Sequence, residues 1–258
     1  MRTHQFHRSM KLGGHPSDPA KLNRELRLAQ YLDAPTFAEF VPPVFRLYQD
    51  IPQFMDLNDQ LGDCVCACMA KMVRGWTQNA TGTAVTITDQ DVLDVYEKGA
   101  GYVPGKPYTD NGWTLIAQLS YWQKTGIAGH TIGAYASINP KNHFLMRSAC
   151  FVFEGLDIAL ALPISAQGQA IWDASPGANG TPGSWGGHCV TIQGVDENDN
   201  PLIETWGYEQ PCTWAFLDKY CTEAHAIISA EALKGDTVPI SGINMAQLAA
   251  DLKAVTSC

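Results

Sequence analysis

The stretch Asn58-Asp59-Gln60-Leu61-Gly62-Asp63-Cys64 carries more structural information than any other part of this sequence. It places a cysteine directly after Gly-Asp, at the start of a predicted amphipathic helix over residues 64–78. A helix N-terminus lowers the pKa of a thiol and favours the thiolate. Asn58, six residues before Cys64, supplies a side-chain amide that can donate a hydrogen bond to an oxyanion. The stretch therefore predicts an activated thiol with an oxyanion donor nearby.

Two downstream motifs supply partners for this thiol. Gly186-Gly187-His188 begins an apolar run and offers a candidate base. Glu204-Thr205-Trp206-Gly207 follows, with Glu204 sixteen residues after His188. A nucleophile, a base and a polar group that orients the base are the components of nucleophilic catalysis.

In this order and at these separations, the motifs resemble those of the papain-like cysteine peptidases over residues 55–230. The resemblance implies that Cys64 is the nucleophile and His188 the base, with Trp206 shielding the third residue. Asn58 stands where the family has a glutamine, and Glu204 where it has an asparagine. More narrowly, Asn-Asp-x-x-Gly-Asp-Cys, Gly-Gly-His and Thr-Trp-Gly resemble a little-characterised group found in bacteria and their phages.

The expected fold class is α+β and papain-like, with the nucleophile helix packed on an antiparallel sheet or barrel. Helices are predicted from Thr88 to about Lys98, over 111–124 with an Asn111 cap, and over 243–254, with a short one within 19–32. Strands are predicted over 151–162, 188–195, 201–206, 213–216 and 225–229, with a hairpin turn at 196–200. An opening like that of a calcium loop at Asp196 lacks the required glycine and final glutamate, so the turn is preferred.

Three segments are expected. Residues 1–45 form an extended N-terminal arm that docks on its own domain or on a neighbouring chain. Residues 46–235 form the papain-like domain, with a helical lobe over about 55–140 and a strand lobe over about 150–230. Residues 236–258 form a C-terminal helix and tail.

Two alternatives concern the cysteines. Gln60 stands six residues before Cys66, but Cys66 lacks the preceding Gly-x and points about 200° away from Cys64 on a helix. The same geometry argues against a metal cluster of Cys64, Cys66 and Cys68, so no metal or cofactor is expected. The other buried cysteines are interpreted as small core residues.

The composition of the chain limits the kinds of partner that we expect. A net charge of −9 over 258 residues argues against a nucleic-acid surface. The sequence has no apolar run of membrane length and no secretory signal, which favours a cytoplasmic or virion-associated protein. The arm predicts a homo-oligomer or a larger assembly.

The leading functional hypothesis is a thiol hydrolase that acts on peptide or amide bonds. Its substrate would lie near Trp185, Gly186, Gly187 and Trp206, because Trp185 belongs to a Gly/Pro-rich loop just before His188. The alternative is a catalytically silent papain-like fold that serves as a structural or binding component, such as part of a phage particle, with its eight cysteines available for disulfides.

Overall fold

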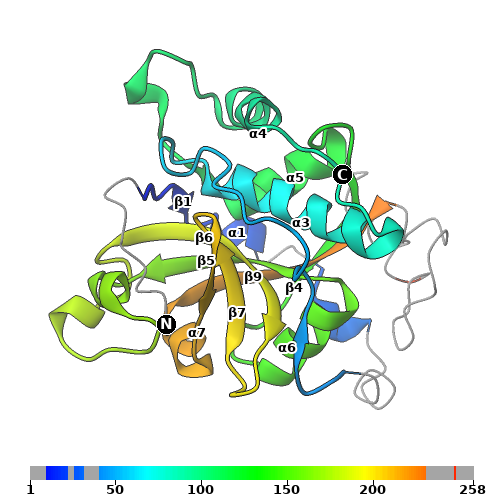
Figure 1. Cartoon of the computed structure of the whole chain (residues 1–258). Helices are drawn as coiled ribbons and strands as arrows, with labels where there is room; N and C mark the ends of the chain where they lie inside the picture. The colour runs from blue at the N-terminus through cyan, green and yellow to red at the C-terminus, as the bar shows by residue number, and fades with distance from the viewer. Residues whose placement is uncertain (1–9, 23–25, 32–40, 231–246, 248–258) are drawn as a thin grey trace.

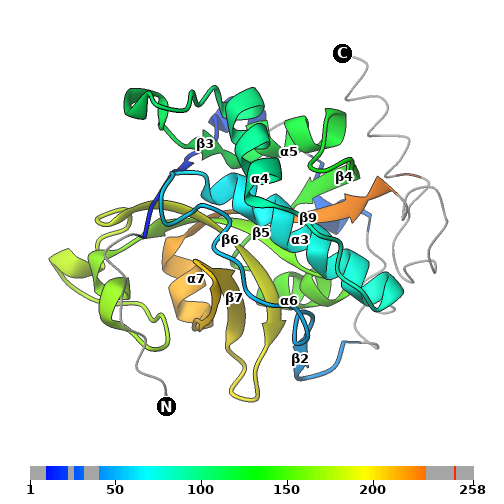
Figure 2. The same cartoon turned by 45° about the horizontal axis from the view of Figure 1, so that its top comes forward.

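The fold was obtained as a computed structural model, which describes residues 10–22, 26–31, 41–230 and 247. Three longer helices and a cluster of short ones surround one large sheet (Figures 1 and 2). The helices are α1 (Pro19–Leu22), α3 (Cys64–Thr81), α4 (Asp89–Val95), α5 (Leu115–Lys124), α6 (His143–Val152) and α7 (Trp214–Tyr220). The strands are β1 (Gly14–His15), β2 (Phe45–Arg46), β3 (Trp113–Thr114), β4 (Ile132–Ser137), β5 (Leu156–Leu162), β6 (Gly186–Val195), β7 (Pro201–Thr205), β8 (Tyr208–Pro211) and β9 (Cys221–Ser229).

The sheet is antiparallel throughout the described residues, in the order β4-β9-β5-β6-β7-β8, with β2 added on β6. Successive side chains of a strand face opposite sides, which lets one sheet close two cores. Ala159, Cys189 and Ile227 face the core shared with α3, α4 and α5. Ile158 and Val190, their neighbours in sequence, face the core shared with α6 and α7. This arrangement confirms the α+β class.

Helix α3 is the central helix of the first half. Twelve consecutive residues from Cys64 to Gly75 are buried, so the helix is enclosed on all sides rather than half-exposed. It packs on β6 of the sheet and on α4 and α5 (Figure 1). The predicted capping box at the start of α4 is also confirmed, because Thr88 and Asp91 exchange side-chain and backbone hydrogen bonds.

Several predicted boundaries are wrong. Thr114, not Asn111, caps α5, since its hydroxyl accepts a hydrogen bond from the Ala117 N–H. Residues 151–152 end α6, and the strand begins only at Leu156, after a turn in which Glu154 has positive φ. Residues 214–216 open α7 instead of forming a strand, because Thr213 caps a helix there.

The other predicted helices and strands are confirmed, shortened or outside the described residues. Strands β6, β7 and β9 and the 196–200 hairpin are confirmed, and Asp196 Oδ1 accepts the backbone N–H groups of Asn198 and Asn200 in the turn. The 19–32 helix reduces to α1 and a single 3-10 turn at Leu28–Gln30 among the described residues. The predicted helix over 243–254 lies outside them, except for residue 247. No helix in the described part of the chain is long and apolar enough to cross a membrane.

Candidate active site

Cys64 is the first residue of α3, and its side chain is 1% exposed. Asp63 caps the helix through its backbone carbonyl, which accepts the N–H groups of Cys66 and Ala67. The sulfur atom therefore lies at the positive end of an 18-residue helix. This is the placement that the Gly-Asp-Cys motif predicted.

His188 lies on β6 and is buried beside Cys64. Its Nε2 atom is 2.7 Å from the hydroxyl oxygen of Thr205, and the Trp206 ring stacks on the imidazole at 4.1 Å between ring centroids. Its Nδ1 atom is buried and has no hydrogen-bond partner among the described residues. Nδ1 is thus the ring nitrogen left to exchange a proton with Cys64.

The surroundings of Cys64 favour its thiolate. Burial alone would raise the pKa of the Cys64 thiol, but its interactions with Cys189 and with the adjacent His188 imidazole bring that pKa well below its ordinary value. The backbone N–H of Cys189 lies 3.4 Å from the Cys64 sulfur. The pKa of the Cys189 thiol is raised well above its ordinary value, first by its hydrogen bond to Cys64 and then by burial. The two opposite pKa shifts favour the anion on Cys64 and the neutral thiol on Cys189.

Sequence reasoning did not single out Cys189. The available signal was its position, directly after the histidine on a strand that had to pack against the nucleophile helix. A side chain there faces α3 by the alternation of the strand.

Glu204 lies away from His188. Its carboxylate is 3.5 Å from the ammonium group of Lys71 on α3 and accepts a hydrogen bond from the Gln193 amide. Successive residues of β7 point to opposite faces, so Thr205 points to the imidazole instead. The sequence placed Glu204 behind His188; the structure places Thr205 there.

Asn58 lies beside the start of α3 but is engaged within its own loop. Its amide nitrogen is 3.1 Å from the Leu61 carbonyl oxygen and 3.2 Å from Oδ1 of Asp63. Burial, reinforced by the charge on Cys64, raises the pKa of Asp63 well above its ordinary value. The predicted oxyanion donor is thus next to the nucleophile and hydrogen-bonded to its neighbour.

The loop before Cys64 is fixed to α3 by buried charges. Asp56 accepts hydrogen bonds from Lys71 at 3.1 Å and from both terminal nitrogens of Arg74, the nearer at 2.7 Å. Burial tends to raise the pKa of Asp56, but the charges of Lys71 and Arg74 lower it overall. Lys71 also contacts Glu204, so one ion-pair network joins the loop, α3 and β7.

The four predicted substrate-binding residues cluster at one end of the sheet. Gly186 and Gly187 open β6 and line a cleft of about 520 Å³. Trp185 packs on Trp206, with 5.4 Å between ring centroids, and Trp206 in turn covers His188. The tryptophans thus form an aromatic wall behind the imidazole.

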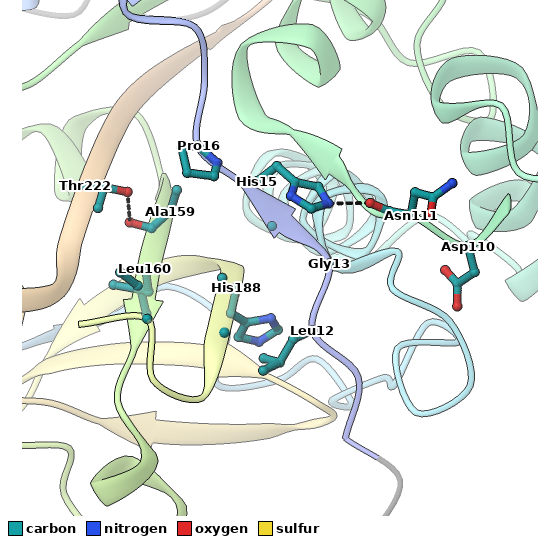
Figure 3. Close-up of a pocket in the computed structure, with 15 residues that line it drawn as sticks. Leu12, Gly13, His15, Pro16, Asp110, Asn111, Ala159, Leu160, His188 and Thr222 are labelled. Atoms are coloured by element: carbon teal, nitrogen blue, oxygen red, sulfur yellow. Dashed lines mark hydrogen bonds between the residues drawn. The ribbon is translucent and has the colours of Figure 1, made fainter. Parts of the chain in front are cut away.

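Residues 10–17 of the N-terminal arm cross this site (Figure 3). The Lys11 N–H donates to the Asn58 carbonyl, and the indole N–H of Trp206 donates to the Lys11 carbonyl. Strand β1 then pairs in parallel with β3, and Figure 3 shows Gly13 and His15 passing between His188 and Asn111. The segment runs from the Asn58–Gly62 loop, which precedes Cys64, to His188 at the start of β6.

The competing cysteine registers are not supported by this geometry. Cys66 is fully buried, and burial raises the pKa of its thiol well above the ordinary value. The seven cysteines in the described residues are free, and Cys258 lies outside them. No group of three or more His, Cys, Asp or Glu side chains in the described ranges is arranged to hold a metal ion.

The fold and the site together define the class: a helical lobe and an antiparallel sheet, with a cysteine at a helix N-terminus facing a strand histidine, form a papain-like fold. Three solved structures support this. Xylellain, a cysteine protease from Xylella fastidiosa, has a TM-score of 0.68 at 13% identity and covers 86% of this chain and 97% of its own. Procathepsin B S9 from Trypanosoma congolense has a TM-score of 0.58 at 10% identity, covering 86% and 87%.

The Carica candamarcensis cysteine protease CMS1MS2, solved in complex with E-64, has a TM-score of 0.51 at 15% identity and covers 73% of this chain and 99% of its own. At these identities the likeness establishes the fold alone. No protein-family model matches the sequence, and no curated protein sequence is significantly similar to it.

Proposed function

We propose that this protein is a papain-like thiol hydrolase that cleaves peptide or amide bonds through Cys64 and His188. One observation carries the proposal: a cysteine with a lowered pKa at the start of α3 lies beside a histidine whose far nitrogen is held by Thr205. A buried pair of this kind has no role in packing that two apolar residues would not fill better.

In the proposed reaction, Nδ1 of His188 takes the proton of the Cys64 thiol. The thiolate attacks the carbonyl carbon of the substrate, and the carbonyl oxygen becomes an oxyanion. Collapse of this intermediate breaks the C–N bond, and the imidazolium gives its proton to the leaving amine. Water, deprotonated by His188, then releases the acyl group and restores the thiol.

Thr205 and Trp206 hold the imidazole in one orientation during these transfers. The Thr205 hydroxyl accepts the Nε2–H, which leaves Nδ1 as the basic nitrogen. The oxyanion donors proposed are the N-terminal N–H groups of α3 and the Asn58 amide, which would turn from the Asp63 carboxylate toward the substrate.

The arm implies that this hydrolase is closed in the state described. Residues 10–17 line the cleft and run between the loop before Cys64 and His188, and Cys64 is 1% exposed, so we propose that the arm moves before a substrate reaches the sulfur. A Gly13→Ala chain, in which the arm no longer fits, is expected to hydrolyse an unfolded protein such as casein faster than the unaltered chain.

Hydrolysis by the Gly13→Ala chain with and without a second Cys64→Ala change tests the proposal. Loss of turnover in the double variant supports it, with Gly13→Ala/Cys66→Ala as the matched control that keeps activity. Equal turnover with and without Cys64 would overturn it. The alternative structural or binding role is supported by none of the comparisons, and a folded, arm-free chain with no thiol-dependent hydrolysis would favour that role.

A further inference from the structure

Two consecutive glycines of the arm approach the backbone of the cleft walls closely. A Cβ atom added at Gly13 would overlap the carbonyl oxygen of Gly62. A Cβ atom at Gly14 would lie 3.0 Å from the backbone nitrogen and carbonyl carbon of His188. Both obstacles are backbone atoms, so no side-chain rotation relieves them. The clash is severe at Gly13 and moderate at Gly14.

The cleft walls are glycines at the matching positions. A Cβ atom at Gly112 would overlap the Gly13 carbonyl oxygen, and one at Gly187 would overlap the Gly14 carbonyl oxygen. One at Gly186 would lie 2.7 Å from a methyl carbon of Leu12. The channel is therefore narrow on both sides, and peptide backbone meets backbone across it.

From Lys11 to Gly14, the remaining contacts of the arm are either independent of its sequence or apolar. Beyond the two glycines, the side chains of His15 and Ser17 form hydrogen bonds with the Asn111 carbonyl and the Glu223 carboxylate. The Trp113 N–H donates to the Gly13 carbonyl at 2.8 Å, a bond that any residue can accept. Leu12, directly before the two glycines, packs partly buried against the core cluster that contains Trp206. Backbone hydrogen bonds give affinity and the walls give selectivity, as in other sites that bind extended peptides.

We infer that the cleft selects peptides with two consecutive glycines preceded by an apolar residue, and that the substrates of the proposed hydrolase carry this sequence. Only the statement that such peptides are substrates rests on the proposed function. The selectivity itself follows from the wall geometry and concerns binding.

The test uses the full-length Gly13→Ala chain and measures alkylation of Cys64 by iodoacetamide, resolved by peptide mass because other thiols are present. Displacement of the arm is expected to raise the rate of Cys64 alkylation by at least about tenfold, because a backbone clash of this severity costs more than 1.4 kcal/mol. Lys11→Ala, which alters an exposed side chain of the same arm, is the matched control and is expected to leave the rate unchanged.

A synthetic peptide with the sequence of residues 10–17 is then added to the Gly13→Ala chain. The native peptide and its Lys11→Ala form are expected to restore protection equally, the Gly14→Ala form less, and the Gly13→Ala form not at all. Equal protection by the Gly13→Ala peptide, or an unchanged alkylation rate in the Gly13→Ala chain, would overturn the inference.

A second variant chain, Ser17→Ala, keeps the test possible if the Gly13→Ala chain misfolds. Ser17→Ala leaves both glycines in place and removes the hydroxyl that joins the arm to Glu223 and to the backbone N–H of Ile116, so the same series of peptides can compete there. Protection from alkylation requires no hydrolysis, so a chain with the expected selectivity and no turnover would refute the proposed function and leave this inference standing.

Discussion

At the scale of single residues, the group that orients His188 is a hydroxyl. The Thr205 hydroxyl oxygen lies 2.7 Å from Nε2 of His188 in a buried setting. Thr205→Ala removes a hydrogen bond worth about 1–2 kcal/mol, which corresponds to a loss of about fivefold to thirtyfold in kcat/KM. Steady-state kinetics in the Gly13→Ala background measures this loss.

Two further variants make the Thr205 assignment specific. Thr205→Ser keeps the hydroxyl and is expected to recover most of the loss. Glu204→Gln is expected to change kcat/KM much less than Thr205→Ala, because Glu204 contacts Lys71 rather than the imidazole. A larger loss from Glu204→Gln than from Thr205→Ala would return the orienting role to Glu204.

The spacing of sixteen residues pointed to strand β7, but the residue of that strand beside the imidazole is Thr205 rather than Glu204, for a physical reason. His188 and Thr205 are seventeen residues apart. The pairing of β6 with β7 shifts between Ile192 and Gly194, and such a bulge inserts one residue and changes which side chain faces the partner. Cys64 and His188 could be found from sequence because helix starts and strand starts leave local signals. A bulge inside a hairpin leaves none.

The thiol of Cys189 offers a second residue-scale prediction. Its hydrogen bond stabilises the Cys64 thiolate, so Cys189→Ala should raise the pKa of Cys64. The pH profile of Cys64 alkylation in the Gly13→Ala background should then move to higher pH, with slower labelling at mildly acidic pH. Cys66→Ala, on the same helix as Cys64, is the matched control and should leave the profile in place.

At the scale of elements, the arm is held beyond the cleft by one buried anchor. The Ser17 N–H and hydroxyl donate to the two oxygens of Glu223 at 2.8 and 2.7 Å. Ser17→Ala removes the hydroxyl bond, and because bonds to charged groups contribute about 1.5–3 kcal/mol, arm opening should rise by about tenfold or more. The rate of Cys64 alkylation measures this opening. Ser120→Ala, which removes a hydroxyl on α5, should leave the rate unchanged.

Helices and strands could be predicted from sequence where a capping motif marks the boundary. They could not be separated where the boundary lies within a long apolar run. The side chains of Thr88 and Asp91, three residues apart, form the capping box that predicts the start of α4. Residues 151–162 read as one apolar strand, yet the chain ends α6, turns through Glu154 and begins β5 within them. The end of α6 and, apart from Asp157, all of β5 are apolar, and an apolar run without polar alternation does not separate a helix from a strand.

At the scale of the whole molecule, the buried network of Asp56, Lys71, Arg74 and Glu204 ties the helical lobe to the sheet. Asp56→Ala leaves Lys71 and Arg74 without their main buried partner and is expected to lower the free energy of unfolding by about 3–5 kcal/mol. Urea unfolding measures the change. Asp94→Ala, which breaks only the exposed pair with Lys98, should cost less than about 1 kcal/mol.

A buried carboxyl group in the sheet, that of Asp157, makes the stability of the protein depend on pH. Burial raises the pKa of Asp157 on β5 well above its ordinary value, so its stabilising neutral form is complete below about pH 4 and is lost as pH rises through the folded pKa. Asp157→Asn stays neutral and should therefore stabilise the protein at neutral pH and have little effect in acid. Thermal unfolding at the two pH values tests this, with exposed Asp50→Asn controlling for loss of a negative charge.

The path of the arm was the part of the molecule least accessible from sequence. Its docking on its own domain was one of the two expectations, but nothing in Leu12-Gly13-Gly14 alone indicates where it docks. The match depends on Gly62, Gly112 and Gly187, which come from three separate parts of the chain. Shape complementarity between distant segments becomes visible only once the fold has brought them together.

The arm is covalently joined to the domain it fills, and this changes what a free peptide must achieve. A tethered segment competes at an effective concentration on the order of millimolar, however dilute the protein is. A free peptide with the same contacts would need a comparable concentration to take its place. One cut in the chain between Ser17 and Gly62 would convert the tethered arm into a separate ligand that dissociates on dilution. The occupancy of the cleft would then depend on protein concentration, whereas in the uncut chain it does not.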